Sequence, residues 1–375
     1  MKRLFIQLGL AIGFGLGLLT LMLGLMAHQA QAMPDSLKLQ QVNEDGFGDI
    51  MNKQIPSLAI FGDYLYAGTW RYDEQGDHSA SIWRSSNGQI WEMVDDRPVN
   101  GAAHMIVFND SIYAGSWDGT IWSSMNGITW TEIITDGFDG TNQGIAHFAV
   151  YSDTLYASTW YSGTEIWRTT NGTSWEPFVE GGLGDLNNGG AIASEIFDMY
   201  LYFGVTNWVS GAQLWRTDGI TITAVITAGF GTIENGGVSS LAFFRDDLYA
   251  GICNYNQGIQ VLRSNNGLDW EDVTDGFTHP ETGCMNSLEV YRDKLYLVIQ
   301  NDESGVEVWR TPNGTEWEQV GFGGFGDPAN TEIFWDNGTL VFKDKLYTGV
   351  RNWPTGGEVW QISDPYINFL PFLNK

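Results

Sequence analysis

The sequence contains few basic residues. Lys and Arg together number 18, against 45 Asp and Glu in 375 residues, so the formal net charge is -27 at pH 7. A surface this acidic repels a phosphate backbone, which excludes nucleic acid as the expected partner. The simplest reason for such a charge is solubility outside the cell.

Motifs of the common catalytic sites are also missing. The chain has no Ser-His-Asp signature, no phosphate-binding loop and no zinc-binding helix motif. A sialidase-like site needs several arginines, but most arginines repeat at one strand position or lie in turns, which leaves Arg71, Arg97 and Arg351. A glycosidase that uses two carboxylates stays open, because the separation of acidic groups is invisible in a sequence. We therefore expect a binding protein before an enzyme.

Proline is scarce, with 10 residues, whereas glycine reaches 47 and the aromatic residues comprise 17 Trp, 15 Tyr and 20 Phe. This composition is typical of many short strands that are joined by tight turns and packed through aromatic rings. With 43% hydrophobic residues, the chain is able to bury a large core. A helical protein is not expected.

Long hydrophobic runs are absent beyond the N-terminus. Lys2 and Arg3 precede an apolar run over 4–27, and an Ala-Gln-Ala sequence at 30–32 offers a cleavage site. We predict a signal peptide over 1–32, with an uncleaved membrane anchor as the alternative. Both place the remainder outside the cytoplasm, secreted or at the cell surface. The apolar tail 366–375 is a sorting or attachment signal, a packed segment or a disordered end.

One short phrase recurs seven times, at spacings of 43 to 51 residues. Each copy leads through a variable loop to a further strand and then to an Asn-Gly or Asp-Gly pair, which we expect to close a two-residue hairpin. Four strands in each unit of this length predict an all-β fold, a seven-bladed β-propeller of four-stranded antiparallel blades. The phrase occupies 65–70, 112–117 and 155–160, and its Leu-Tyr core recurs at 201–202, 248–249, 295–296 and 346–347.

The segment SSNGQIW at 85–91 typifies a second repeated motif, Ser/Thr-x-Asn-Gly-x-x-Trp. It resembles the Asp-box of bacterial neuraminidase-type propellers, with Asn in place of Asp and one residue fewer before the Gly. The resemblance covers six short segments. It implies a β-propeller and does not extend to sialidase activity.

The two ends of the chain are expected to meet. The seventh unit, 332–362, supplies three strands, and residues 38–43 match the end of the sixth unit at 317–320. We therefore predict that the N-terminal strand closes the last blade, which removes open strand edges between the first and last blades. The propeller would then span 33–365 as a single domain.

In a propeller, the loops before the first strand and after the second strand share the face at the channel mouth. Indoles there would stack on sugar rings while amides bind hydroxyl groups, whereas packing between blades is the structural alternative. The candidate ligand-binding residues after the second strands are Trp70, Trp117, Trp160, Asn207, Trp208, Tyr255, Asn301 and Trp353.

Two further candidate sites follow from the repeat. His104 and His147 occupy the same position in adjacent units, so they would converge on an anion, a metal or a substrate, or form a structural pair. The Gly-rich, Asp-containing loops such as 46–49 and 324–327 offer oxygen ligands for calcium, with ordinary turn chemistry as the alternative. No cofactor is certain.

The two cysteines fall at corresponding ends of neighbouring units. Cys253 ends a second strand and Cys284 begins the next first strand, which predicts a disulfide in an oxidising compartment, with two buried thiols as the alternative. Together these features predict a secreted or cell-surface protein whose channel face recognises a glycan or a protein. The alternative is an extracellular glycoside hydrolase or lyase that acts on polysaccharides.

Overall fold

The structure is a computed structural model of the chain. It describes residues 37–72, 76, 78–102, 104–135, 137–138, 144–161, 163–254, 256–274, 276–277, 282–336 and 338–364. The predicted signal peptide 1–32, the tail 366–375 and Tyr255 lie outside the described residues. Contacts group Leu37–Asp364 into one compact unit. In the part of the chain that is described, no helix has the length and apolar character needed to cross a membrane.

Five separate four-stranded antiparallel sheets follow one another along the chain, and each pairs its strands in sequence order. Their strands are β6 (His104–Phe108), β7 (Ser111–Gly115), β8 (Ile121–Ser124), β9 (Thr131–Ile134); β10 (Ile145–Tyr151), β11 (Thr154–Thr159), β12 (Ile166–Thr169), β13 (Glu176–Val179); β14 (Asn188–Phe197), β15 (Tyr200–Asn207), β16 (Gln213–Thr217), β17 (Ile222–Ile226); β18 (Asn235–Phe244), β19 (Asp247–Asn254), β20 (Gln260–Ser264), β21 (Glu271–Asp272); and β22 (Thr282–Tyr291), β23 (Lys294–Asn301), β24 (Glu307–Thr311), β25 (Glu318–Gly321).

The remaining sheet has nine strands and contains both ends of the described chain. Its strands are β1 (Lys38–Gln41), β2 (Asn52–Phe61), β3 (Tyr64–Tyr72), β4 (His78–Ser85), β5 (Glu92–Arg97), β26 (Asn330–Ile333), β27 (Thr339–Phe342), β28 (Lys345–Asn352) and β29 (Glu358–Ser363). A single residue pair, Gln54 with Arg351, joins β2 to β28. Because pairing unites these strands in one sheet, the count of seven blades stays a prediction from the repeat.

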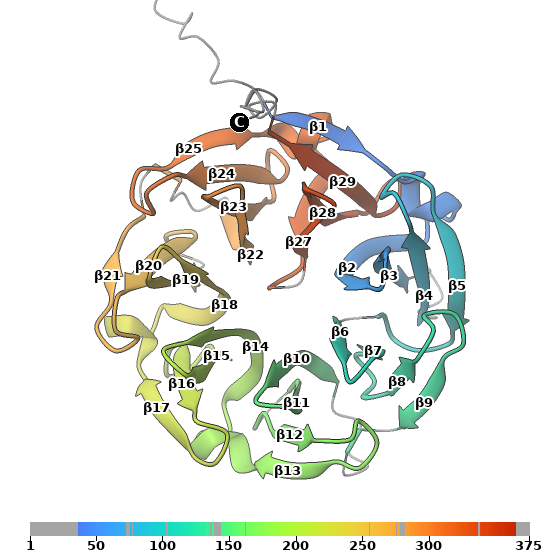
Figure 1. Ribbon diagram of the computed structural model, residues 1–375. Coiled ribbons are helices and arrows are strands. Elements are labelled where there is room, and N and C mark those ends of the chain that lie inside the picture. Colours follow the sequence, from blue (N-terminus) through green and yellow to red (C-terminus); the bar gives the residue numbers. More distant parts are fainter. Residues whose placement is uncertain are drawn as a thin grey trace, which may run out of the picture. The chain divides into compact units, whose positions relative to one another are not determined.

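The N-terminal strand pairs with the last strand of the chain. β1 lies antiparallel to β29, in a register that runs from Lys38 opposite Ser363 to Gln41 opposite Trp360. The predicted closure of the last unit by the N-terminal strand is therefore confirmed. Figure 1 shows the sheets in succession around a ring, with β2, β6, β10, β14, β18, β22 and β27 at the inside and β1, β5, β9, β13, β17, β21 and β25 at the outside.

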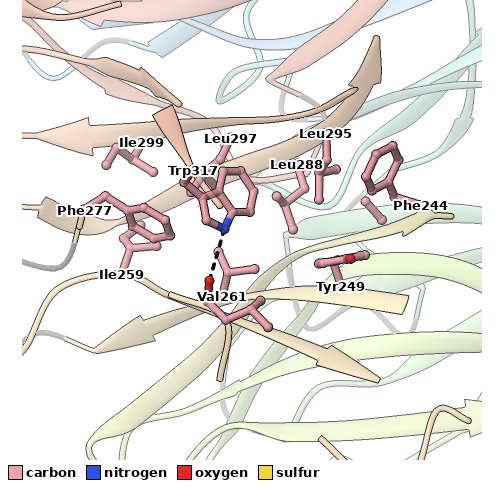
Figure 2. Packing of buried hydrophobic residues seen from close by; sticks show 12 residues of the cluster. Phe244, Tyr249, Ile259, Val261, Phe277, Leu288, Leu295, Leu297, Ile299 and Trp317 are labelled. Atoms are coloured by element: carbon pink, nitrogen blue, oxygen red, sulfur yellow. Dashed lines mark hydrogen bonds between the residues drawn. The ribbon is translucent and has the colours of Figure 1, made fainter. Parts of the chain in front are cut away.

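The hydrophobic core lies between neighbouring sheets. Figure 2 shows one such cluster, in which Leu288 and Leu297 of one sheet pack with Tyr249 of the preceding sheet. Trp317, the tryptophan of the second repeated motif, is 8% exposed there, and its indole N–H donates to the Val273 carbonyl at 3.1 Å. Burial of such large side chains at each boundary gives a large apolar contribution to stability.

The two repeated motifs meet across several boundaries between sheets. A Cβ atom at Gly172, in an Asn-Gly pair, would lie 1.8 Å from the hydroxyl oxygen of Tyr113 in the preceding sheet, and Gly172 has a φ of +79°. Only glycine meets both requirements. The same approach joins Gly127 to Tyr66, so the Leu-Tyr phrase and the Asn-Gly pair form one packing contact.

The prediction that Asn-Gly pairs close two-residue hairpins is wrong. In the loop between β4 and β5, the Asn87 side-chain oxygen accepts the backbone N–H groups of Gln89 and Ile90, each at 2.9 Å, and Asn87 has no positive φ. The side chain stabilises a longer turn. The two-residue hairpins join first to second strands instead, as at Asn109 and Asp110, with φ values of 46° and 59°.

A disulfide joins Cys253 to Cys284. Cys253 lies near the end of β19 and Cys284 near the start of β22, and their Cα atoms are 4.5 Å apart. The predicted bridge between adjacent sheets is therefore confirmed.

Candidate functional site

Short glycine-rich turns hold neighbouring sheets together at one end of their strands. These turns are η1 (Asp45–Gly48), η2 (Gly181–Gly184), η3 (Gly229–Gly231) and η4 (Gly323–Gly326). Each precedes a first strand. η1, η3 and η4 also bond to the loop that follows the second strand of the sheet before them, as where Gly229 N–H donates to the Ala212 carbonyl at 2.9 Å. We call the surface that is formed by the loops before first strands and after second strands the loop face.

Buried asparagines fix these loops. Asn188 donates to the Gly182 carbonyl at 2.8 Å, and Asn207 donates to the side-chain oxygen of Asn188 at 2.8 Å. Asn207 also accepts the N–H groups of Val209 and Ser210. Both amides are fully buried. The amide of Asn207, which the sequence suggested as a ligand contact, is therefore engaged by hydrogen bonds within the protein.

The same arrangement recurs elsewhere on the loop face. Asn301 is 3% exposed, donates to Glu307 Oε1 at 2.8 Å and accepts two backbone N–H groups of the following turn. Its amide is therefore engaged within the fold, as that of Asn207 is. Further pairs are Asn254 with Asn235 and Asn352 with Asn330.

The Asp-containing loops use their oxygens for turns. Asp185 accepts the N–H of Asn187 at 2.9 Å, the Asn207 amide at 2.9 Å and the Ser210 hydroxyl at 2.7 Å. These bonds, with that from Ser210 strongest, hold the pKa of Asp185 below its usual value. Within the described ranges, no group of three or more His, Cys, Asp or Glu is placed to hold a metal ion. The loop at 139–142 lies outside the described residues.

Large apolar side chains are exposed on the loop face where the first and last units of the chain meet. Trp353, in the loop after β28, is 41% exposed, and its ring lies 5.8 Å from that of Tyr72 at the end of β3. Ile50 precedes β2, is 53% exposed and lies against Gly356, in the same loop as Trp353. Ile50, Tyr72 and Trp353 are therefore exposed in adjoining segments, and we call such a group of neighbouring exposed apolar residues an apolar cluster.

Two other boundaries present similar side chains. Leu186, which precedes β14, is 66% exposed and lies beside Gly163, close to the exposed Tyr161. Trp208 is 47% exposed and covers Gly236, three residues after the exposed Ile233. Each cluster combines an aliphatic residue from a glycine-rich loop with an aromatic residue from the preceding sheet. Exposed apolar groups that repeat on one face are typical of an interaction surface.

A second feature lies inside the ring. The innermost strand of the last unit is split into β26 and β27, and we call residues 334–336 between them the channel insert. Figure 1 shows the connection at β27 reaching toward the middle of the ring. Trp335 stacks on Trp160, with ring centroids 4.9 Å apart, and lies 6.0 Å from Trp117. The insert therefore contacts sheets that are not its neighbours in the ring.

Asp336 extends these contacts to three further sheets. Its carboxylate accepts the backbone N–H groups of Ser194 at 3.1 Å and of Leu241 at 3.4 Å. The Ser287 hydroxyl donates to the Asp336 carbonyl at 3.4 Å. Burial raises the pKa of Asp336 to about 8.

The predicted histidine pair adjoins the insert. The rings of His104 and His147 lie 4.4 Å apart, and His104 Nδ1 accepts the Phe148 N–H at 2.7 Å. His147 Nε2 lies 2.8 Å from Ser194 Oγ and 3.9 Å from Asp336 Oδ2. A catalytic triad places the serine and the carboxylate at opposite ring nitrogens, whereas both are at Nε2 here. Burial lowers the pKa of His147 to about 3, so the imidazole is neutral.

A cavity of about 470 Å³ adjoins the insert and is lined by carboxyl groups from three sheets. They belong to Glu195, Glu289 and Asp336, and no Lys or Arg is among the described residues of its wall. Burial, with the neighbouring charges of Asp336 and Glu195, raises the pKa of Glu289 to about 8. Glu289 therefore retains a proton for much of the time near neutral pH.

Solved structures of the same architecture cover most of the chain. YCF48 from Cyanidioschyzon merolae matches with a TM-score of 0.59 over 88% of this chain and 99% of its own, at 11% sequence identity. This chain is a β-propeller. YCF48 bound to D1 peptide matches with a TM-score of 0.58 at 12% identity, over 90% and 98% of the two chains. No protein-family model matches the sequence, and no curated protein does. At these identities the likeness shows the fold alone.

The propeller places the five predicted tryptophans in three different settings. Trp208 and Trp353 are exposed on the loop face, whereas Trp117 and Trp160 pack on the channel insert. Trp70 is half-buried, and its indole N–H donates to Asn100 Oδ1 at 2.9 Å. The predicted ring of stacking indoles therefore does not form one platform.

Sequence reasoning missed the channel insert and the aliphatic residues of the loop face. The length of the last unit could have revealed the insert. The innermost segment of that unit spans 13 residues from Asn330 to Phe342, whereas the corresponding strand β14 has 10. The exposed aliphatic residues could also have been found from the repeat. Ile50, Leu186 and Ile233 follow the same glycine-rich pattern at the same position.

Proposed function

We propose that this propeller is a binding protein that recognises a protein partner through its loop face. The observation that carries the proposal is the repeated exposure of aliphatic–aromatic clusters, typified by Ile50 with Trp353 and by Ile233 with Trp208. Apolar and aromatic anchors of this kind dominate the energetics of protein interfaces.

A protein partner is favoured over a glycan. Sugar binding requires polar groups that are available to the hydroxyls of the ring, but the loop-face amides of Asn207 and Asn301 are already engaged within the fold. Ile50, Leu186 and Ile233 offer no polar group in their side chains. A structure of YCF48 carries a bound D1 peptide, so the fold is compatible with a peptide ligand.

We propose a location outside the cytoplasm, secreted or at the cell surface. The N-terminal sequence with its Ala-Gln-Ala motif supports this location, and so does the disulfide between Cys253 and Cys284, since disulfides persist in oxidising compartments. The likeness of the Ser/Thr-x-Asn-Gly-x-x-Trp motif to the bacterial Asp-box supports a bacterial propeller lineage. It carries no catalytic assignment.

A polysaccharide hydrolase is the second candidate. Glu289 and Asp336 have pKa values raised to about 8 in one cavity, and a protonated carboxyl group is what a glycosidase uses as its general acid. Incubation with a set of polysaccharides tests this candidate. Released reducing ends that disappear in the Glu289→Gln variant would favour the hydrolase.

The test of the main proposal is selection of binders from a phage-displayed library of random peptides. We expect the selected peptides to lose affinity for the Trp208→Ala/Trp353→Ala variant and to retain it for Met125→Ala/Ile220→Ala. Met125 and Ile220 are each 82% exposed in turns at the opposite ends of the strands, so they are matched controls. Selected peptides that bind both variants equally well would contradict the loop face as the binding surface. Binding to a glycan array that is lost in Trp353→Ala would show that the ligand is a glycan and not a protein.

A further inference from the structure

Acidic residues accompany the three exposed aliphatic residues of the glycine-rich loops. Asp49 directly precedes Ile50, Asp185 precedes Leu186, and Glu234 follows Ile233. The fourth glycine-rich loop repeats the pattern with Asp327 before Pro328. Negative charge therefore borders the apolar clusters at each of these boundaries.

The basic side chains near these clusters are engaged within the protein. Arg71 forms an ion pair with Asp49 at 3.2 Å, and the Lys53 ammonium donates to the Trp353 carbonyl at 2.7 Å. Arg351 forms an ion pair with Glu332 in the neighbouring strand. These three cations are bound to groups of the protein itself, whereas the side chains of Glu44 and Glu234 are exposed to solvent.

The net charge of the whole chain is also negative. With 45 acidic and 18 basic residues, the protein repels anionic surfaces at long range. Charge complementarity steers association and discriminates against partners of like charge. A partner that covers the apolar clusters must also approach their acidic borders.

We propose that the partner presents a cationic segment in which Lys or Arg side chains are interspersed with apolar ones. This inference rests on the proposed function and specifies the chemistry of the segment. Its apolar side chains cover the clusters of Trp353 and Trp208, and its cations lie beside the exposed Glu44 and Glu234. An acidic or neutral segment would leave those carboxylates without partners at the interface.

The test compares three synthetic peptides of equal length. Each has the same Leu and Trp residues, which are interspersed with Lys in the first peptide, Gln in the second and Glu in the third. We expect the Lys peptide to bind the full chain roughly tenfold more tightly than the Gln peptide, and the Glu peptide to bind most weakly. The advantage of the Lys peptide should shrink as salt is raised from about 0.05 M to about 0.5 M.

Charge variants locate the effect. Glu44→Gln/Glu234→Gln should lower affinity for the Lys peptide about threefold or more and leave the Gln peptide unchanged. The matched control is Asp153→Asn/Asp198→Asn, which removes the same charge from hairpins at the opposite ends of the strands. Both control residues have positive φ values, which Asn adopts readily.

The outcomes separate this inference from the proposed function. Equal affinity for the Lys and Gln peptides, or an equal effect of the control pair, would overturn the cationic partner. The proposed function survives that result if Trp208→Ala/Trp353→Ala weakens binding of every peptide that binds. If the tryptophan variant leaves all binding intact, the loop face is not the binding surface and both proposals fail.

Discussion

Trp335 stacks on Trp160 across the inside of the ring, with the two ring planes inclined by 29°. Trp335 belongs to the interrupted innermost strand of the last unit, whereas Trp160 directly follows β11. Asp336 adds hydrogen bonds to β14 and β18. The channel insert therefore connects sheets that share no boundary, which supplements the pairing of β1 with β29.

We expect Trp335→Ala to destabilise the protein. The indole contacts Trp160, Trp117 and Phe334, and its removal leaves a cavity that the rigid sheets fill poorly. For a half-buried tryptophan the cost is about 2 kcal/mol of unfolding free energy. Denaturant titration measures it, with Met125→Ala, an 82% exposed residue, as the control. A loss no larger than that of the control would show that the insert does not stabilise the ring.

The repeat predicted the regular features of the fold and missed those that break it. Copies of one motif specify strands, sheet order and the positions of Cys253 and Cys284, since each feature recurs at a fixed place. Trp335 and Asp336 occur once, in an enlarged unit, so comparison of the copies does not indicate where their side chains lie. The internal hydrogen bonds of the Asn207 amide were not foreseen for another reason: a sequence does not distinguish a buried, bonded amide from one that faces a ligand.

Glu289 should make stability depend on pH. Its pKa is raised to about 8 in the folded protein from about 4.5 when unfolded, so the unfolded state ionises first as pH rises. Stability contributed by the protonated form is therefore complete below about pH 4 and is lost as pH rises to about 8.

Glu289→Gln removes this dependence. We expect the variant to be more stable than the original protein at pH 8.5, by about 1 kcal/mol or more, and equally stable near pH 4. Denaturant titrations at the two pH values measure the difference. Glu234→Gln, at an exposed position, serves as the control and should show no such change between the two pH values. An equal stability of the Glu289→Gln variant and the original at pH 8.5 would contradict the buried-acid interpretation.

His147 should remain neutral throughout the physiological range. Burial lowers its pKa to about 3, and its Nε2 lies 2.8 Å from Ser194 Oγ. Between pH 5 and 7, below the range in which the neighbouring Asp336 ionises, its imidazole nitrogen chemical shifts should therefore stay constant, as nitrogen-15 NMR would record. The His147→Gln variant assigns the signal. Titration of that signal near pH 6.5 would mean that the ring is accessible to water.

The disulfide should contribute to stability through the unfolded state. Cys253 and Cys284 are 31 residues apart, and a loop of that length corresponds to about 3–4 kcal/mol in the chain-entropy description. The Cys253→Ser/Cys284→Ser variant should lose about that amount in denaturant titration. Mass spectrometry of non-reduced peptides should find the two cysteines in one cross-linked fragment. Two thiols that both react with an alkylating agent in the folded protein would contradict the bridge.

The N-terminal strand should be necessary for a stable ring. Leu37 and Val42 are each 6% exposed, and Val42 packs in a cluster with Ile55 and Val359. Deleting residues 37–43 exposes this surface and leaves the edge of β29 unpaired, so the melting temperature should fall sharply.

The point variant Val42→Ala tests the same contact with the strand retained. We expect it to cost about 2 kcal/mol, because the methyl groups it removes are buried between the first and last units. Gln40→Ala, on the exposed side of β1, should change stability by less than about 0.5 kcal/mol. If the deletion and Val42→Ala both leave stability unchanged, the pairing of β1 with β29 contributes nothing to closure, and the ring must be held by its other boundaries and the channel insert.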